Sequence, residues 1–392
     1  MPDRTRSDIW RGDLAAFGIV LAILVALVGL APRAFEVAQR PPVNQAQDGR
    51  VLRVVSERTQ PSDRGDVHVR VLEVALPEQV VTVEEGTSAR EVSLVPAQPG
   101  DRVLVQSVPG PAGGESVYYI VDHQRSRVLW VFGAAFAVLV LFVGRWHGLR
   151  SLLSLGVTYL ILMRFIIPGI LSGYSPLVLS LVGGTAIMAT TLVLAHGVDR
   201  KSAAAIAGTG IALVLIVALS QIAIVFAKLT GLVGDDEAST VFVLFGGAID
   251  ARGLLLSGIL IGALGALDDV TMTQSSAIFE LRDANPLLRP RELYERGMRI
   301  GRDHIASIVN TLVLAYAGAS MPLLVILASQ TEGVGTLLNR EFLASEVVRT
   351  VVGSIGIVAA VPLTTAIAAM LAVGVAASSS GAPSSDDAHH HA

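Results

Sequence analysis

The stretch LLLSGILIGALGALDDVTMTQSSAIFEL, residues 254–281, decides the fold class, because its apolar run has the length of a membrane-spanning helix. Two adjacent carboxylates, Asp268 and Asp269, lie near its centre. An acidic side chain at the bilayer midplane costs about 2.5–3.5 kcal/mol on insertion scales, so such residues usually face a protein interior or a water-filled cavity. The pair therefore indicates an ion, proton or substrate pathway. The alternatives are a structural ion pair with Arg164 or Arg252, or a helix end in the cytoplasm.

The composition of the whole chain agrees with membrane residence. Of its 392 residues, 52% are hydrophobic and 16% are charged, whereas a soluble protein has about 25% charged residues. The chain has no cysteine, which excludes disulfides, thiolate catalysis and cysteine-ligated metals. It also lacks a basic domain that would meet a phosphate backbone, so we expect no nucleic-acid partner.

The first segment, residues 1–31, has the pattern of a signal anchor. Arginines precede an apolar run over residues 14–31. A cleaved signal peptide is the alternative, but the run is long for one, and the Pro32-Arg33 that follows is not a small-residue cleavage site. We expect an uncleaved helix with its basic end in the cytoplasm.

Residues 32–127 have the pattern of a small all-β domain. Short Val-rich runs of alternating apolar residues are bounded by Gly, Pro, Asp or Ser, which is typical of strands and turns. Five such strands favour a small β-barrel or sandwich, with an OB-like barrel as the leading candidate. We expect a rigid extracytoplasmic domain, inserted between the first and second membrane helices. The runs are RVLRVVSE (50–57), VHVRVLEVAL (67–76), QVVTVEEG (79–86), DRVLVQSV (101–108) and ESVYYIVD (115–122).

The remaining region, residues 128–376, predicts a seven-helix transmembrane domain, so that about eight helices cross the membrane in an α-helical polytopic fold. A shorter apolar piece, residues 240–250, is too short to cross alone and predicts a re-entrant or interfacial half-helix. The tail, residues 377–392, is rich in Ser, Ala and Asp and is expected to be disordered. The seven predicted spans are 128–144, 150–171, 177–196, 203–230, 253–280, 304–328 and 346–374.

Arginine and lysine are distributed as the positive-inside rule requires. With the N-terminus inside, the cytoplasmic loops hold Arg200, Lys201 and several arginines between residues 282 and 302, whereas the outside loop GDDE (234–237) is acidic. Both termini are therefore predicted to be cytoplasmic and the β domain extracytoplasmic. Arg164 breaks the pattern within its span, where it either snorkels to the outer boundary or lines a cavity.

A candidate site follows from the helical positions of the polar residues near the two acids. Asp269 shares one face with small residues and hydroxyls at spacings of three and four. Small residues allow close approach of another helix, and hydroxyls beside a carboxylate suit a hard cation or a proton relay. Asp268 points about 100° away, so the two acids need not serve the same partner. The shared face comprises Gly262, Gly265, Asp269, Thr273 and Ser276.

The next predicted span carries a matching polar stripe. Asn310 and Thr311 place an amide and a hydroxyl at a depth where unsatisfied polar atoms are costly, so they require a partner. The helix with the two acids is the obvious candidate. The predicted pathway residues are Asp268, Asp269, Thr273, Ser276, Asp303, Ser307, Asn310 and Thr311.

Two segments, GALGALDDVTMTQSSAIFEL (262–281) and ERGMRIGRDHIASIVNTLVLAYAGASMPLLV (295–325), resemble the hallmark segments of the YibE/F-like family. The resemblance covers residues 130–375 and implies a multi-pass protein of the bacterial plasma membrane, with a soluble portion after the first helix. It also implies that Asp269 is the aligned acid. A shorter string, LDDVTMTQSSAIFELRD (267–283), is similar to the proton-relay helix of SecDF-like and resistance–nodulation–division exporters.

These patterns favour a proton- or cation-coupled transporter, in the direction of export. A passive ion channel and a non-transporting scaffold, whose β domain binds an envelope partner, are the alternatives. An enzyme is not expected, because the chain lacks a metal-ligand set, a nucleophile motif and a phosphate-binding loop. No cofactor is expected, and metal binding is left open. The expected partners are the lipid bilayer, a small ion or solute and, as an open alternative, further copies of the chain in a homo-oligomer.

Overall fold

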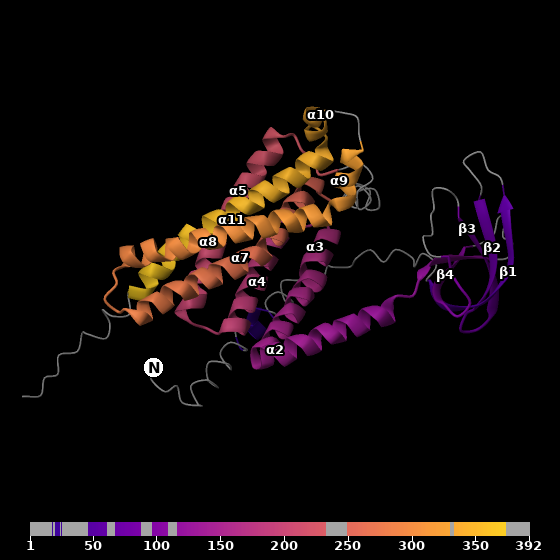
Figure 1. Cartoon of the computed structure of the whole chain (residues 1–392), viewed down its shortest axis with the longest axis horizontal. Helices are drawn as coiled ribbons and strands as arrows, with labels where there is room; N and C mark the ends of the chain where they lie inside the picture. Colours follow the sequence, from indigo (N-terminus) through magenta and orange to yellow (C-terminus); the bar gives the residue numbers. More distant parts are fainter. Residues whose placement is uncertain are drawn as a thin grey trace, which may run out of the picture. The chain divides into compact units, whose positions relative to one another are not determined.

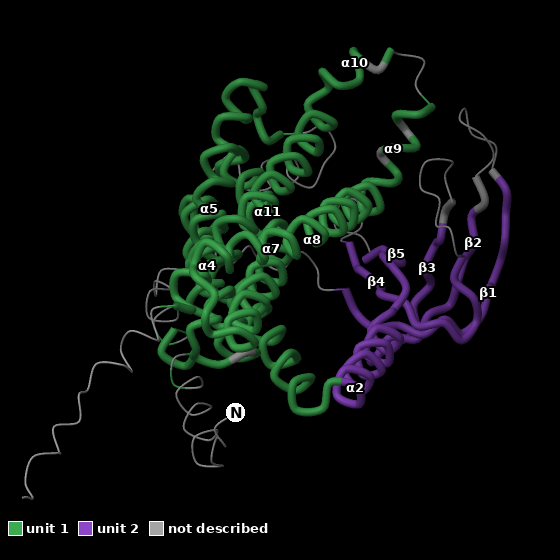
Figure 2. Tube along the Cα trace, turned by 60° about the vertical axis from the view of Figure 1, so that its left-hand side comes forward, with its two compact units in different colours: residues 1–37, 144–392 green, residues 38–143 purple. Residues whose placement is uncertain are grey.

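The computed structural model describes residues 18, 20–23, 25, 46–60, 67–87, 96–108, 116–232, 249–329 and 333–373. The chain forms two compact units, one of residues 1–37 with 144–392 and one of residues 38–143 (Figure 2). The first unit is helical, and the second contains the β domain. The predicted half-helix (240–250) and tail (377–392) lie almost entirely or entirely outside the described residues.

The helical elements follow one another in the order that Figure 1 colours by sequence. They are α2 (Ser126–Ile161), η2 (Leu162–Ile166), α3 (Ile167–Leu171), α4 (Pro176–His196), α5 (Arg200–Phe226), α7 (Ala251–Ala284), α8 (Pro290–Ala319), α9 (Met321–Ala328), α10 (Val334–Leu338) and α11 (Glu341–Val373). Of these, α7 carries the two acids and packs against α4, α5, α8 and α11. It is therefore the central helix of the unit.

The packing of α5 against α11 depends on glycine. A Cβ on Gly208 would lie 2.9 Å from the Thr364 Cβ, and one on Gly356 would lie 2.2 Å from the Ile216 Cγ1. The two helices can therefore approach closely only without side chains at these points. Polar pairs add to the packing of α7, because its Thr271 hydroxyl lies 2.8 Å from that of Thr209 on α5.

Five helices in the described part of the chain are long and apolar enough to cross a membrane. The first runs over Ser126–Leu171, contains 46 residues and covers two of the predicted spans. It is kinked at Arg145, which has a left-handed φ of 49°. The other four are α4, α5, α7 and α11, each at the position of a predicted span.

The remaining predicted spans are not among these five. Residues 304–328 fall on α8 and α9, which are interrupted at Ser320. The helix α8 is too polar, and α9 too short, to be counted among the five apolar helices. Only a few residues of the first span are described; they are helical, and Val20 packs against Val193 and Leu194 of α4. The total of eight spans therefore stays a prediction.

The α-helical geometry changes to a π-helical turn where α2 ends. Residues Leu162–Ile166 form a π-helical turn, followed by Pro168 in the first turn of α3. Proline has no N–H, so the carbonyl four residues earlier loses its helical donor, and a wider turn accommodates this loss. Arg164 lies in this turn with its side chain exposed.

The β domain is a closed five-stranded barrel with the strand order β1-β2-β3-β5-β4. Neighbouring strands are antiparallel except β3 and β5, which are parallel, an arrangement expected of an OB-like barrel and not of a two-sheet sandwich. Val51, Leu72, Val83 and Val103 lie in its core, where they are almost fully buried. The strands match the predicted runs: β1 (Gln47–Gln60), β2 (Val67–Ala75), β3 (Val80–Thr87), β4 (Arg102–Val108) and β5 (Val117–His123).

Candidate functional site

A pocket of about 330 Å³ lies between α2, η2, α4 and α7, and all of its lining residues belong to the helical unit. Its walls are largely apolar and include Leu162, Ile187, Met188 and Leu264. One carboxylate and several hydroxyl groups interrupt these apolar walls. The polar lining residues are Ser151, Ser154 and Thr158 from α2, Thr191 from α4, and Asp268 from α7.

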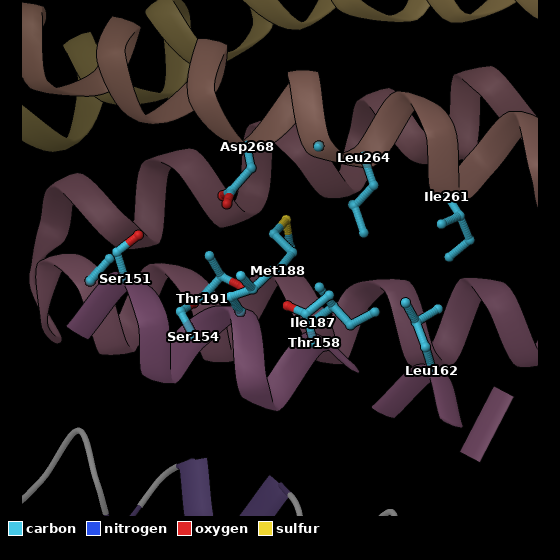
Figure 3. A pocket seen from close by; sticks show the side chains of 13 residues that line it. Ser151, Ser154, Thr158, Leu162, Ile187, Met188, Thr191, Ile261, Leu264 and Asp268 are labelled. Atoms are coloured by element: carbon cyan, nitrogen blue, oxygen red, sulfur yellow. The ribbon is translucent and has the colours of Figure 1, made fainter. Parts of the chain in front are cut away.

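Among the described residues, Asp268 is the only acidic one that lines this pocket. Figure 3 shows its carboxylate directed from α7 into the space above Thr191 and Met188. Its Oδ1 atom is buried and has no hydrogen-bond partner among the described residues. Ser154, which is 4% exposed, has a buried hydroxyl oxygen without a partner as well. Buried polar atoms are almost always satisfied in proteins, so each exception requires an explanation.

Helical periodicity explains how these side chains reach one space. Ile261, Leu264 and Asp268 are spaced by three and four residues, so they share the face of α7 that lines the pocket. Ser151, Ser154 and Thr158 repeat the same spacing on α2. The pocket is therefore the place where a hydroxyl-bearing face of α2 meets the Asp268 face of α7.

The other predicted residues of α7 do not line the pocket. Asp269 and Thr273 are exposed and Ser276 is half-buried. Their face is the exposed side of α7, because the helix buries the opposite side, with Leu260, Leu267 and Thr271, against its neighbours. This face meets α8 at Gly262, which lies beside the Tyr316 hydroxyl, but no helix covers it at Asp269 and Thr273 in the described structure.

The predicted stripe on α8 also lies away from the pocket. Asp303, Ser307, Asn310 and Thr311 are all exposed, in contrast to the buried positions expected from the sequence. The helix α8 instead packs through Gly297 and Gly301, whose bare backbones fit against Ile278 of α7 and Val361 of α11. Thr311 satisfies its hydroxyl locally, by donating to the Ser307 carbonyl at 2.9 Å.

The polar connection between α7 and α8 is made by a residue outside the predicted site. The Gln274 amide nitrogen donates to the Gly297 carbonyl and to the Thr365 hydroxyl, both at 2.8 Å. Gln274 is buried and joins three helices, which makes it a packing residue. No ion pair links Asp268 to Arg164 or Arg252 in the described part of the chain, so the structural ion-pair alternative lacks support there.

The hydroxyl-bearing residues of α2 are the part of the candidate site that sequence reasoning missed. A serine or threonine in an apolar helix usually satisfies its hydroxyl on its own backbone, so each one alone carries little signal. The common spacing of Ser151, Ser154 and Thr158 was the available signal. It becomes informative only once the structure places this face opposite Asp268.

The YibE/F-like protein family model matches residues 132–374, which is more than half of the chain. The chain belongs to the YibE/F-like family. The matched region begins in α2 and ends just after α11, so it contains every residue of the Asp268 pocket. The barrel of this YibE/F-like protein precedes the matched region. No curated protein and no solved structure matches the chain.

Among the described residues, no group of three or more His, Cys, Asp or Glu side chains is placed to hold a metal ion. The pocket instead combines one carboxylate with neutral hydroxyl oxygens. This donor set suits a proton, passed between carboxylate and hydroxyls or water, or a small cation with few charged ligands.

Proposed function

We propose that this YibE/F-like protein is an integral membrane transporter in which Asp268 takes up and releases a proton or a small cation. The observation that carries the proposal is the buried Asp268 Oδ1, which has no partner in the described structure and faces a hydroxyl-lined pocket. Transported solute and coupling ion would move in linked steps, in the direction of export.

The energetics of burial support a change of charge at Asp268. A bare carboxylate removed from water is strongly unfavourable unless it is paired, hydrogen-bonded or neutralised. Since no cation side chain pairs with Asp268 in the described residues, a bound proton or cation would neutralise it. Release of that proton or cation would require water or a rearrangement of the pocket, and this requirement is what links ion binding to conformation.

The membrane setting is part of the same proposal. The five apolar helices, the N-terminal apolar run and the positions of the arginines support eight spans in a bacterial plasma membrane, with both termini cytoplasmic. In that topology the barrel is extracytoplasmic. Labelling of single cysteines, placed one at a time in this cysteine-free chain, would test the side of each loop with an impermeant thiol reagent.

Flux into proteoliposomes tests the transport function. Purified protein would be reconstituted and assayed with a panel of monovalent and divalent cations, with and without a pH gradient, for wild type and Asp268→Asn. We expect flux driven by the gradient, and its loss in the variant. Downhill flux alone would indicate a passive channel. No flux under any gradient would favour a scaffold and contradict the proposal.

A further inference from the structure

A second polar cluster lies where α7, α8 and α11 meet, apart from the Asp268 pocket. Its centre is Arg349 on α11, whose Nη1 lies 3.2 Å from the Glu346 Oε2 one turn earlier. Tyr316 of α8 reaches the same region, because its hydroxyl is close to where Cβ atoms on Gly262 and Gly353 would be, at 3.0 and 3.9 Å. An arginine within a membrane region is a functional candidate by default.

The cluster contains several buried donors without acceptors. The Nε of Arg349, the hydroxyl of Tyr316 and the hydroxyl of Ser345 are all buried and have no partner in the described structure. Ser345 is 5% exposed and precedes Arg349 by one turn on the same face of α11. The Nε–H of arginine can only donate, so whatever satisfies it must supply an acceptor.

The geometry of Arg349 selects the kind of acceptor. Glu346 holds Nη1, whereas Nε, on the edge that it shares with Nη2, is buried and lacks an acceptor in the described structure. That edge binds the two oxygens of a carboxylate or phosphate group through parallel hydrogen bonds. The ion pair with Glu346 therefore explains the orientation of the guanidinium but does not satisfy its second edge.

The Nη2 end of this edge lies beside the bare backbone of α7 at Gly258. A Cβ on Gly258 would lie 3.9 Å from Nη2, and Gly258 itself is exposed. The Arg349 side chain is 35% exposed although its Nε is buried, so a ligand can reach the exposed part of the side chain from outside the helical unit. A glycine at this position permits close approach of a ligand to the helix.

We propose that Arg349, assisted by Tyr316 and Ser345, binds an oxyanion, namely a carboxylate or phosphate group, against Gly258 of α7. The group belongs either to a solute or to a lipid headgroup. None of these residues lines the Asp268 pocket, so the anion site can be tested independently of the proposed ion coupling.

Anion titration of the purified full-length protein tests the site. In delipidated detergent micelles at constant ionic strength, sodium acetate or inorganic phosphate would replace chloride while the thermal unfolding midpoint is followed. We expect a saturable rise for wild type and its loss in Arg349→Lys, which keeps the charge but not the two-pronged edge. Arg164→Lys, at an exposed arginine of η2, is the matched control and should keep the rise.

A second variant guards against misfolding at Arg349. Gly258→Ala adds one methyl group at ordinary contact distance from Nη2, so the helix should fold while the anion binds about tenfold more weakly or worse.

A third experiment compares nanodiscs of phosphatidylglycerol with nanodiscs of phosphatidylcholine, to identify whether the bound oxyanion belongs to a lipid or to a solute. Loss of the acetate response only in phosphatidylglycerol assigns the site to a lipid phosphate, and its persistence in both assigns it to a solute. No saturable response in wild type, or equal responses in wild type, Arg349→Lys and Gly258→Ala, would overturn the proposal.

Discussion

Asp268 and Asp269 are neighbours in sequence, yet only the Asp268 carboxylate lines the pocket between α2, α4 and α7. Asp269 is exposed on another side of the same helix. A helix turns by about 100° per residue, so adjacent residues cannot share a face. The two acids therefore offer an internal comparison, in which an equal change of charge is made inside and outside the pocket.

The hydroxyls of the pocket should contribute to ion binding. Thr191→Val removes one hydroxyl from the lining beside Asp268 while keeping the shape of the side chain. We expect gradient-driven flux in proteoliposomes to fall about tenfold or more, the scale of one lost proton-transfer or ligand contact. Thr185→Val on the same helix is the control, because its exposed hydroxyl donates only to the Leu181 carbonyl. Equal flux in both variants would remove Thr191 from the pathway.

The α5–α11 contact should be sensitive to a single methyl group. A Cβ on Gly208 would lie 3.1 Å from the Thr364 Cα and closer still to its side chain, so Gly208→Ala forces the helices apart. We expect a loss of about 1–3 kcal/mol in the free energy of unfolding, as for other overpacked sites, measured by denaturation in detergent. Gly210→Ala, with open space at its Cβ, should be neutral or stabilising by up to about 1 kcal/mol.

Two ion pairs of the barrel should differ in their effect on stability. Glu85 accepts from Arg70 and from the Ala97 N–H, and its side chain is only 10% exposed. Glu85→Gln should cost about 1.5–3 kcal/mol, seen as faster hydrogen exchange in β2 and β3 of the full-length protein. The control is Glu84→Gln, whose pair with Arg58 is mostly exposed and is worth less than about 1 kcal/mol. A reversed order would contradict the assigned burial.

Glu73 should contribute to barrel stability in a pH-dependent way. Its two oxygens accept from Arg53 at 2.7 and 2.8 Å, and this hydrogen bonding lowers the pKa of the Glu73 carboxyl below its ordinary value. A lowered pKa means that the contribution is present above the ordinary pKa of about 4.3 and is lost as the pH falls through the folded-state value. Hydrogen exchange in β1 and β2 should therefore differ between wild type and Glu73→Gln at pH 7. The difference should vanish at strongly acidic pH.

The barrel could be predicted from sequence because the pattern that defines each strand lies within that strand and its adjacent turns. Alternating valines and turn residues define each strand, and the strand ends differ from prediction by at most a few residues. The apolar composition that predicts a long helix also lies within the helix itself, so α4, α5, α7 and α11 lie where hydropathy places them. Hydropathy also placed the break between its spans 128–144 and 150–171 correctly, because the helical backbone of α2 is interrupted at Arg145.

The candidate site could be predicted only in part, because it depends on which helix faces which. The spacing on α7 correctly separated Asp268 from Asp269 but favoured Asp269, since its face carries glycines and hydroxyls. In the structure Asp269 is exposed, and so is the α8 stripe of Asp303 and Asn310. Which helices pack against each other depends on contacts between residues far apart in sequence. The periodicity within one helix does not predict these contacts.

The most direct test compares the two acids under one driving force. Proteoliposomes containing a trapped pH dye would receive wild type, Asp268→Asn or Asp269→Asn at equal protein density, with an imposed pH gradient and the cation that supports flux. The account predicts that Asp268→Asn abolishes coupled proton or cation movement, while Asp269→Asn retains most of it. Loss in Asp269→Asn with normal movement in Asp268→Asn would contradict the assignment of the pocket.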